Sequence, residues 1–288
     1  MSPKPLAIPV LCYHSWTIGS DYQSDDHLAL EADLHTLAGR GYKILPLVAL
    51  VDLILGRLSP AQLEAERVVC ISCDDGKRYD YFDSCREDGS VIKSFHSLLL
   101  ESTNSLPNAY PGARATAFVI CSEAARRQLS AAFNESYDHW TDSWWASCAR
   151  GGILGVANHS WDHVHEALEN VRQKENKKGS FFQIKTQLDA DAQIADAQVA
   201  LKSLTADHNE AIFGYPYGHV SAYLKDVYLP RFGASMGLMG AFSTAGDFAS
   251  LSTNVWDIPR FVCGYHWKSS EEFNHLLDAA ESRQESSE

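Results

Sequence analysis

Two histidines with the spacing of metal ligands follow an apolar run near the middle of the chain. The run from Ile153 to Ala157 predicts a buried strand of a parallel sheet, and His159 and His163 come directly after it. If the chain turns helical after this strand, the two imidazoles share one face and can hold one small cation. Because histidines at this spacing also cap helices or lie at the surface, a metal site requires an oxygen ligand from elsewhere.

Two adjacent carboxylates can supply that oxygen. An apolar run over residues 67–73 leads directly into Asp74, Asp75 and Gly76, so both acids lie where a predicted strand passes into a loop. A metal-dependent hydrolase needs three protein ligands, an open position for water and a base that takes a proton from the water. Asp75 and the two histidines form such a ligand set, and a turn at Gly76 leaves Asp74 available as the base. An Asp-Asp-Gly sequence alone also marks an ordinary turn, so the metal interpretation depends on the histidine pair.

The composition indicates a globular protein and argues against several kinds of partner. The chain has 288 residues, of which 45% are hydrophobic and 21% are charged, and this suits one domain with a large core. A formal net charge of −13 argues against nucleic acids and anionic membranes as partners, because both require a basic surface. Seven cysteines, an odd number scattered along the chain, predict buried thiols in a reducing compartment, and neither disulfides nor a zinc cluster.

No apolar stretch approaches the roughly 18 residues that a membrane-spanning helix needs. Residues 1–10 also lack the apolar segment of a secretion signal. We therefore expect a soluble, cytoplasmic protein, and a secreted chain whose signal had been removed would show the same pattern. The sequence leaves the oligomeric state open.

Predicted strands alternate with predicted helices, without internal repeats or linkers rich in Ser and Pro. Strands are expected at residues 8–13, 42–45, 67–73, 115–121, 153–157, 211–217, 240–244 and 256–262. Helices are expected near residues 27–40, 47–58, 91–101, 142–150, 181–204 and 270–283, and after residue 122. The candidate inward positions of the helix at 181–204 are Ile184, Leu188, Ile194, Val199 and Leu201. Seven or eight strands separated by helices predict an α/β fold, a distorted (β/α) barrel, with a doubly wound open sheet as the alternative.

The reactive groups of such a barrel lie at the carboxyl ends of its strands. The polar residues that fall at predicted strand ends are His14, Asp74, Asp75, His159, Arg260 and the segment 215–217. Several separate strands therefore converge on one site in the predicted fold.

Five short motifs include these residues. They are Ile8-Pro9-Val10-Leu11-Cys12-Tyr13-His14, Ser72-Cys73-Asp74-Asp75-Gly76, His159-Ser160-Trp161-Asp162-His163, Phe213-Gly214-Tyr215-Pro216-Tyr217-Gly218 and Ile258-Pro259-Arg260-Phe261. In this order they resemble the polysaccharide deacetylase family, also called NodB homology or carbohydrate esterase 4, with its Thr-Phe-Asp-Asp-Gly and His-(Ser/Thr)-x-x-His motifs. The other three resemble the branch of that family with Tyr-Pro-Tyr-Gly and Pro-Arg. The resemblance spans residues 8–262.

The resemblance implies a fold and a metal site. It implies one NodB-like barrel domain over residues 1–288, in which segments near 86–112 and 133–151 are insertions that shape the cleft. Asp75, His159 and His163 would hold one divalent ion, expected to be Zn²⁺, with Co²⁺, Ni²⁺ or Mn²⁺ as alternatives.

Further residues receive catalytic roles from the same resemblance. Asp74 would be the general base, paired with Arg260, which keeps the pKa of Asp74 low enough for it to stay ionised. The backbone N–H of Tyr217 would stabilise the oxyanion of the tetrahedral intermediate. His14 would be the general acid, with His266 in reserve, because the family's Leu-x-His motif is not evident near the C-terminus.

The implied reaction is removal of acetyl groups from an N-acetylated carbohydrate, or secondarily from an O-acetylated one. The residues expected to contact the substrate are Tyr215, Pro216, Trp161, Trp267 and His266. One alternative keeps the fold and metal but uses a small non-sugar amide, imide or formyl substrate. The other is a carbohydrate-binding protein without catalysis. The chain departs from many family members at Gly214, where they have an arginine, so Arg260 would act alone.

Overall fold

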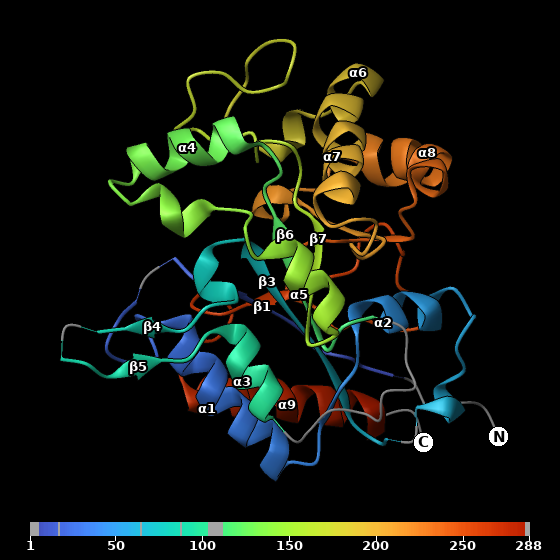
Figure 1. The fold of residues 1–288 in the computed structure, drawn as a ribbon. Coiled ribbons are helices and arrows are strands. Elements are labelled where there is room, and N and C mark those ends of the chain that lie inside the picture. The colour runs from blue at the N-terminus through green and yellow to red at the C-terminus, as the bar shows by residue number, and fades with distance from the viewer. Residues whose placement is uncertain (1–5, 17, 64, 87, 103–111, 286–288) are drawn as a thin grey trace.

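The computed structural model of the chain describes residues 6–16, 18–63, 65–86, 88–102 and 112–285, and its centre is a parallel sheet (Figure 1). The strands of this sheet are β1 (Val10–His14), β2 (Lys43–Ile44), β3 (Val68–Asp75), β6 (Ala115–Val119), β7 (Leu154–Asn158), β8 (Ile212–Gly214), β9 (Gly240–Phe242) and β10 (Phe261–Val262). Their order is β10-β1-β3-β6-β7-β8-β9, with β2 beside β3. Two short antiparallel strands, β4 (Ser84–Cys85) and β5 (Val91–Ile92), form a separate hairpin.

The sheet is strongly curled, so that its two ends approach each other. Phe242 at the end of β9 forms a parallel bridge with Ile258, which lies shortly before β10 in the chain. The backbone N–H of Ser243 also donates to the carbonyl of Ile258 at 2.8 Å. The predicted α/β fold is confirmed, with a parallel and curled sheet. The strands predicted at 42–45, 240–244 and 256–262 are shorter than expected, because only part of each segment pairs with a neighbour.

The residues of β3 show how the sequence produces this sheet. Val69, Ile71 and Cys73 pack into one apolar cluster, whereas Cys70 belongs to another, as expected when successive side chains point to opposite faces. All of β3 is buried, which explains its nearly continuous apolar sequence. The same alternation directs Asp74 to the face of Cys70.

Helices cover the sheet on both sides. They are α1 (Asp26–Gly39), α2 (Leu47–Ile54), α3 (Phe95–Glu101), α4 (Glu123–Ala132), α5 (Trp145–Gly151), α6 (Gln187–Ala190), α7 (Asp196–Leu204), α8 (Leu229–Met236) and α9 (Ser270–Glu285). Figure 1 shows α1, α3 and α9 side by side, with α4, α7 and α8 at the opposite end of the molecule. Among the described residues, no helix is both long and apolar enough to cross a membrane.

The prediction of one long helix over residues 181–204 is wrong, because the segment is divided into several shorter elements. A 3₁₀ turn (Phe181–Gln183) comes first, and a π-helical turn (Asp191–Ala195) separates α6 from α7. A π turn adds a residue to the turn and rotates the following helix face, so one ideal periodicity does not describe the segment. Leu188 and Val199 are consequently exposed, whereas the predicted inward positions Ile184, Ile194 and Leu201 are buried.

The cysteines are free thiols, as the sequence predicted. All seven lie within the described residues, and six of them are buried, with Cys85 exposed. Burial raises the pKa of the Cys73 thiol well above its ordinary value, so Cys73 beside the aspartates remains protonated and does not act as a nucleophile.

Candidate metal centre and active site

The register of the sheet brings residues from distant parts of the chain to one edge. His14 at the end of β1 is paired with Asp74 on β3. Asp75, the last residue of β3, is level with the ends of β6 and β7, and His159 follows β7 directly. The predicted convergence of strand ends is therefore present in the structure.

A turn at the end of β3 points both aspartates at the same imidazole. Asp75 and Gly76 both have a φ of 75°, and a Cβ atom at Gly76 would lie 2.6 Å from the side chain of Val119, so only glycine fits there. The Nε2 atom of His159 lies 3.8 Å from Oδ2 of Asp74 and 3.7 Å from Oδ1 of Asp75.

His163 reaches the same point through a loop, and the helix considered for this segment is not formed. Ser160 and His163 have φ values of 70° and 62°, which are incompatible with a right-handed helix. The loop is held by its own side chains, because Asn158 Oδ1 accepts from Ser160 N at 2.8 Å and Ser160 Oγ accepts from His163 N at 2.9 Å. His163 Nε2 thereby lies 3.7 Å from Oδ1 of Asp75.

Asp75, His159 and His163 fit the donor set of a small divalent cation. One ligand atom of each lies within 4.8 Å of the others, and all three residues are buried. Donors about 2.1 Å from a tetrahedral ion lie roughly 3.4 Å apart, close to the observed separations. His159 Nδ1 lies 2.8 Å from the carbonyl of Gly214 and donates to it, which leaves Nε2 free for the cation.

The electrostatics of these residues also suit metal binding. Burial lowers the pKa of His163 to about 3, so its imidazole is neutral, the form that binds a metal. Burial acts against the charge of Asp75, but the surrounding histidines outweigh it and bring the pKa of Asp75 below its ordinary value. The site thus offers one anionic oxygen and two imidazole nitrogens.

Trp16, which the sequence analysis did not single out, contacts this centre directly. Its indole Nε1 donates a hydrogen bond to Oδ2 of Asp75. Its ring also packs edge-on against His14, with the ring centroids 5.0 Å apart. The only sequence signal for this residue is its position shortly after His14 at the end of a strand.

Asp74 is held by a buried arginine, as predicted. Arg260 donates to both carboxylate oxygens of Asp74, at 2.6 and 2.8 Å, and also to the hydroxyl of Ser72 at 3.0 Å. Burial alone would raise the pKa of Asp74, but the charge and the hydrogen bonds of Arg260 hold it well below its ordinary value. Asp74 is therefore an ionised carboxylate beside the proposed cation.

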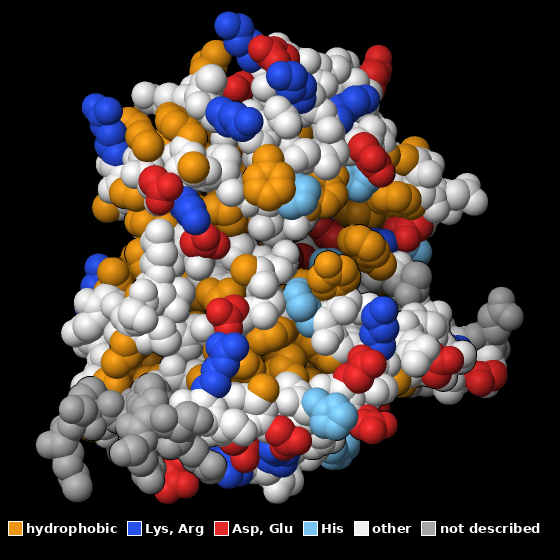
Figure 2. Space-filling view, turned by 180° about the vertical axis from the view of Figure 1, so that it is seen from behind, with side chains coloured by type: hydrophobic (Ala, Val, Ile, Leu, Met, Phe, Trp, Pro, Cys, Tyr) orange, Lys and Arg blue, Asp and Glu red, His pale blue; other side chains and the backbone are white. Residues whose placement is uncertain are grey.

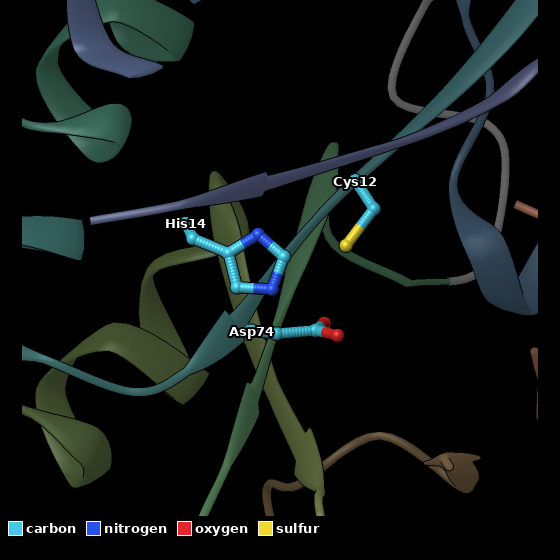
Figure 3. Close-up of side chains that lie close together, drawn as sticks. All are labelled: Cys12, His14 and Asp74. Carbon is cyan, nitrogen blue, oxygen red and sulfur yellow. The ribbon is translucent and has the colours of Figure 1, made fainter. Parts of the chain in front are cut away.

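Cys12, His14 and Asp74 form a second group of potential ligands (Figure 3). Cys12 and His14 lie on β1, and Figure 3 shows both side chains on the same side of the sheet as the Asp74 carboxylate. However, Asp74 already accepts two hydrogen bonds from Arg260, and burial raises the pKa of the Cys12 thiol well above its ordinary value. A protonated thiol is a poor ligand. His14, beside Asp74, therefore remains the predicted general acid.

These residues open into one large cavity of about 920 Å³. The predicted residues that line it are His14, Asp74, Asp75, His159, His163 and Tyr217. Figure 2 shows hydrophobic and histidine side chains gathered around a hollow near the middle of the face opposite to that in Figure 1. Tyr217 has a φ of 59° in the turn after β8, which sets the direction of its backbone N–H.

The five residues predicted to contact the substrate do not line this cavity. They are Tyr215, Pro216, Trp161, Trp267 and His266. Tyr215 is fully buried, and its hydroxyl donates to the carbonyl of Trp256 at 2.8 Å. Pro216 is buried as well.

The other three are occupied elsewhere. Trp267 is fully buried, and its Nε1 donates to Asp33 at 3.1 Å. The guanidinium group of Arg172 lies over the ring of Trp161, 4.4 Å from the ring centroid. His266 Nδ1 accepts from the backbone N–H of Val262 at 2.7 Å, and His266 does not line the cavity that contains Asp74 and His159.

The cavity walls contain residues that the sequence analysis missed. They are Lys77, Ile120, Leu129, Phe133, Glu135, Trp140, Phe182, Val220, Val262 and Tyr265. Phe133, Glu135 and Trp140 of this wall come from the segment 133–151, which the sequence analysis predicted to be an insertion. Residues 103–111 of the other predicted insertion lie outside the described residues, and the described part of that insertion does not line the cavity.

One segment of the chain matches a known family. Residues 109–230, fewer than half of the chain, match the family model described as Polysaccharide deacetylase. The segment contains His159, His163 and Tyr217. It begins after Asp74 and Asp75 and does not include them. The match supports the resemblance over this segment. A search of curated proteins found no similar sequence.

Several solved structures share the fold. The deacetylase PplD from Streptococcus pyogenes, solved in complex with acetate, gives a TM-score of 0.59 at 14% identity, covering 95% of this chain and 98% of that chain. IcaB from Ammonifex degensii gives 0.61 at 16% identity, covering 95% and 97%. A de-N-acetylase from Aggregatibacter actinomycetemcomitans gives 0.60 at 14% identity, covering 94% and 99%. At these identities the likeness establishes the fold.

Proposed function

We propose that this chain is a metal-dependent deacetylase of the polysaccharide deacetylase family that removes acetyl groups from an N-acetylated carbohydrate. The observation that carries the proposal is the convergence of Asp75, His159 and His163 on one point beside a separate carboxylate, Asp74. The family match of residues 109–230 and the shared fold support it. The Tyr-Pro-Tyr-Gly and Pro-Arg motifs favour the branch that carries them.

The residues of the chain divide the work of hydrolysis. A bound divalent cation, expected to be Zn²⁺, supplies Lewis acidity that polarises the acyl carbonyl and lowers the pKa of a water molecule. Asp74 takes a proton from the attacking water, and Arg260 keeps Asp74 ionised and in place. The backbone N–H of Tyr217 stabilises the oxyanion, a contribution worth about 3 kcal/mol of barrier in comparable sites. His14 gives a proton to the leaving nitrogen.

A small non-sugar amide, imide or formyl compound is the second candidate substrate. The observation that favours it is the largely apolar wall of the cavity, formed by residues such as Leu129, Phe133 and Trp140. An O-acetylated carbohydrate remains the third candidate, because the same groups hydrolyse esters.

Release of acetate tests the proposal. The purified protein, loaded in turn with Zn²⁺, Co²⁺, Ni²⁺ and Mn²⁺, is incubated with N-acetylglucosamine oligosaccharides, an O-acetylated sugar and small acetamides. We expect acetate from an N-acetylated sugar, and none from the Asp74→Asn variant. Acetate only from small amides would support the second candidate. Sugar binding without acetate release under any metal would contradict an enzymatic function.

A further inference from the structure

One wall of the cavity is apolar and lies beside the metal ligands. It is formed by Ile120, Leu129, Phe133 and Trp140, which we call the apolar arm. Leu129 belongs to α4, Phe133 follows that helix, and Ile120 follows β6. Ile120, Leu129 and Trp140 are almost fully buried, whereas Phe133 is 49% exposed. The apolar arm therefore consists of three buried side chains and one aromatic ring, that of Phe133, which is accessible to a ligand.

The imidazole of His165 connects the apolar arm to the metal-ligand candidate His163. The ring centroids of His163 and His165 lie 5.7 Å apart, and the ring of Phe133 meets His165 edge-on at 5.5 Å. The ring of Trp140 also stacks with that of Phe133, with the centroids 6.3 Å apart and an interplanar angle of 15°. A substrate group bound along these rings would therefore lie close to the amide bond that is hydrolysed at the metal site.

The charged groups beside the arm, Lys77 and Glu135, bind each other. Lys77 donates to both carboxylate oxygens of Glu135, at 2.7 and 2.9 Å, and to the carbonyl of Trp16 at 3.4 Å. The indole Nε1 of Trp140 donates to Glu135 at 2.8 Å, and the ammonium group of Lys77 lies 4.7 Å from the centroid of the Trp140 ring. All three donors of Lys77 are thus in use.

A sugar ring would bind poorly in this arm. Its hydroxyl groups would lose water and compete for partners that are already paired, and burial of an unpaired hydroxyl is costly. An apolar ring would lose nothing comparable and would stack on Phe133. A volume of about 920 Å³ also exceeds what an acetyl group fills and suits a ligand with a further bulky group.

We propose that the apolar arm binds an aromatic or similarly bulky apolar group attached next to the scissile amide of the substrate. This inference rests on the proposed deacetylase function and specifies its substrate. Such a group can belong to the amine side, as an aryl glycoside, or to the acyl side, as an aroyl group in place of acetyl. The shared requirement is an apolar ring within reach of the metal site.

Three substrates separate these cases in the metal-loaded protein. They are the methyl glycoside of N-acetylglucosamine, its 4-nitrophenyl glycoside and the methyl glycoside of N-benzoylglucosamine. We expect kcat/KM for at least one of the two aromatic compounds to exceed that of the first by tenfold or more, and the compound that gains identifies the side. Equal values for all three would overturn the inference and leave the deacetylase function standing. Hydrolysis of none of them would count against the deacetylase function.

A binding measurement tests the arm without catalysis. Isothermal titration calorimetry of the metal-free protein with 4-nitrophenyl and methyl β-glucosaminide, and with benzoate and acetate, should show tenfold tighter binding of one aromatic member. Phe133→Ser should remove this preference. Phe82→Ser is the matched control, because Phe82 is also partly exposed and does not line the cavity. Loss of preference in both variants, or in neither, would contradict the assignment of the arm.

Discussion

Asp74 accepts hydrogen bonds from both terminal nitrogens of Arg260, at 2.6 and 2.8 Å, although 186 positions separate the two residues in the chain. Its neighbour Asp75 instead faces His159 and His163, each at 3.7 Å. The two adjacent carboxylates share His159, whose Nε2 lies 3.8 Å from Oδ2 of Asp74, but they differ in their other partners. Asp74 is paired with the buried side chain of Arg260, whereas Asp75 accepts a hydrogen bond from Trp16 and belongs to the candidate ligand set.

Asp74→Asn should stop turnover while the metal stays bound. The amide keeps the shape of the carboxylate but cannot take a proton from water, and loss of a general base typically lowers the rate about 10²- to 10⁴-fold. The measurement is kcat for acetate release, together with metal content by atomic emission. Turnover near that of the unmodified protein would show that another group is the base.

Arg260→Met should destabilise the metal-free fold by about 3 kcal/mol, because it leaves Asp74 buried without a counter-charge. Urea denaturation followed by circular dichroism measures the free energy of unfolding. Arg283→Met is the matched control, since Arg283 pairs with Asp247 at 2.6 Å with both side chains exposed. This control should cost less than about 1 kcal/mol. Equal losses of unfolding free energy in the two variants would contradict the claim that the buried ion pair contributes more to stability than the exposed one.

Trp16→Phe should weaken metal binding about 10- to 100-fold. The indole hydrogen bond to Oδ2 orients the Asp75 carboxylate, and removal of such an outer partner typically has an effect of this size. Competition with a chromogenic chelator gives the metal dissociation constant. Trp161→Phe serves as the control, because Trp161 packs against Arg172 away from the cavity. An unchanged dissociation constant for Trp16→Phe would contradict the orienting role.

Glu210→Gln should change how stability depends on pH. Burial raises the pKa of Glu210 from 4.5 to about 7, although its carboxylate accepts hydrogen bonds from Thr116 and from Ala113 N. The folded state thus holds this proton more tightly than the unfolded chain, so the contribution of Glu210 to stability is lost as pH rises from about 4.5 to about 7.

The two proteins are compared by denaturant unfolding at pH 5 and pH 8. Relative to the unmodified protein, the Gln variant should gain about 2 kcal/mol between these pH values. A constant difference between the two proteins would show that Glu210 titrates normally in the folded state.

The convergence of the candidate ligands and Asp74 could be predicted from the sequence, because strand ends and local motifs determine it. The buried sequence of β3 leads directly into Asp74 and Asp75, and parallel strands place their carboxyl ends at one edge of the sheet. Arg260 could be paired with Asp74 through the motif resemblance. The structure also explains the glycine at position 214, because a Cβ atom there would lie 2.7 Å from the ring of Phe118.

The walls of the cavity could not be predicted, because tertiary packing alone decides them. Trp267 was itself predicted to contact the substrate, yet it is fully buried and donates to Asp33. Phe133 and Trp140 reach the cavity from the segment after α4, and no periodicity in the sequence marks them. The backbone conformation between His159 and His163 could not be predicted either. Hydrogen bonds within this loop replace the helix that the spacing indicated.

The central claim is that Asp75, His159 and His163 hold one catalytic cation. Its most direct test is the metal stoichiometry of the purified protein, measured by mass spectrometry after dialysis against Zn²⁺, in parallel with Asp75→Ala and Asp74→Asn. We predict one equivalent per chain in the unmodified protein and in Asp74→Asn, and none in Asp75→Ala. Absence of bound metal from the unmodified protein, or a full equivalent in Asp75→Ala, would contradict the account.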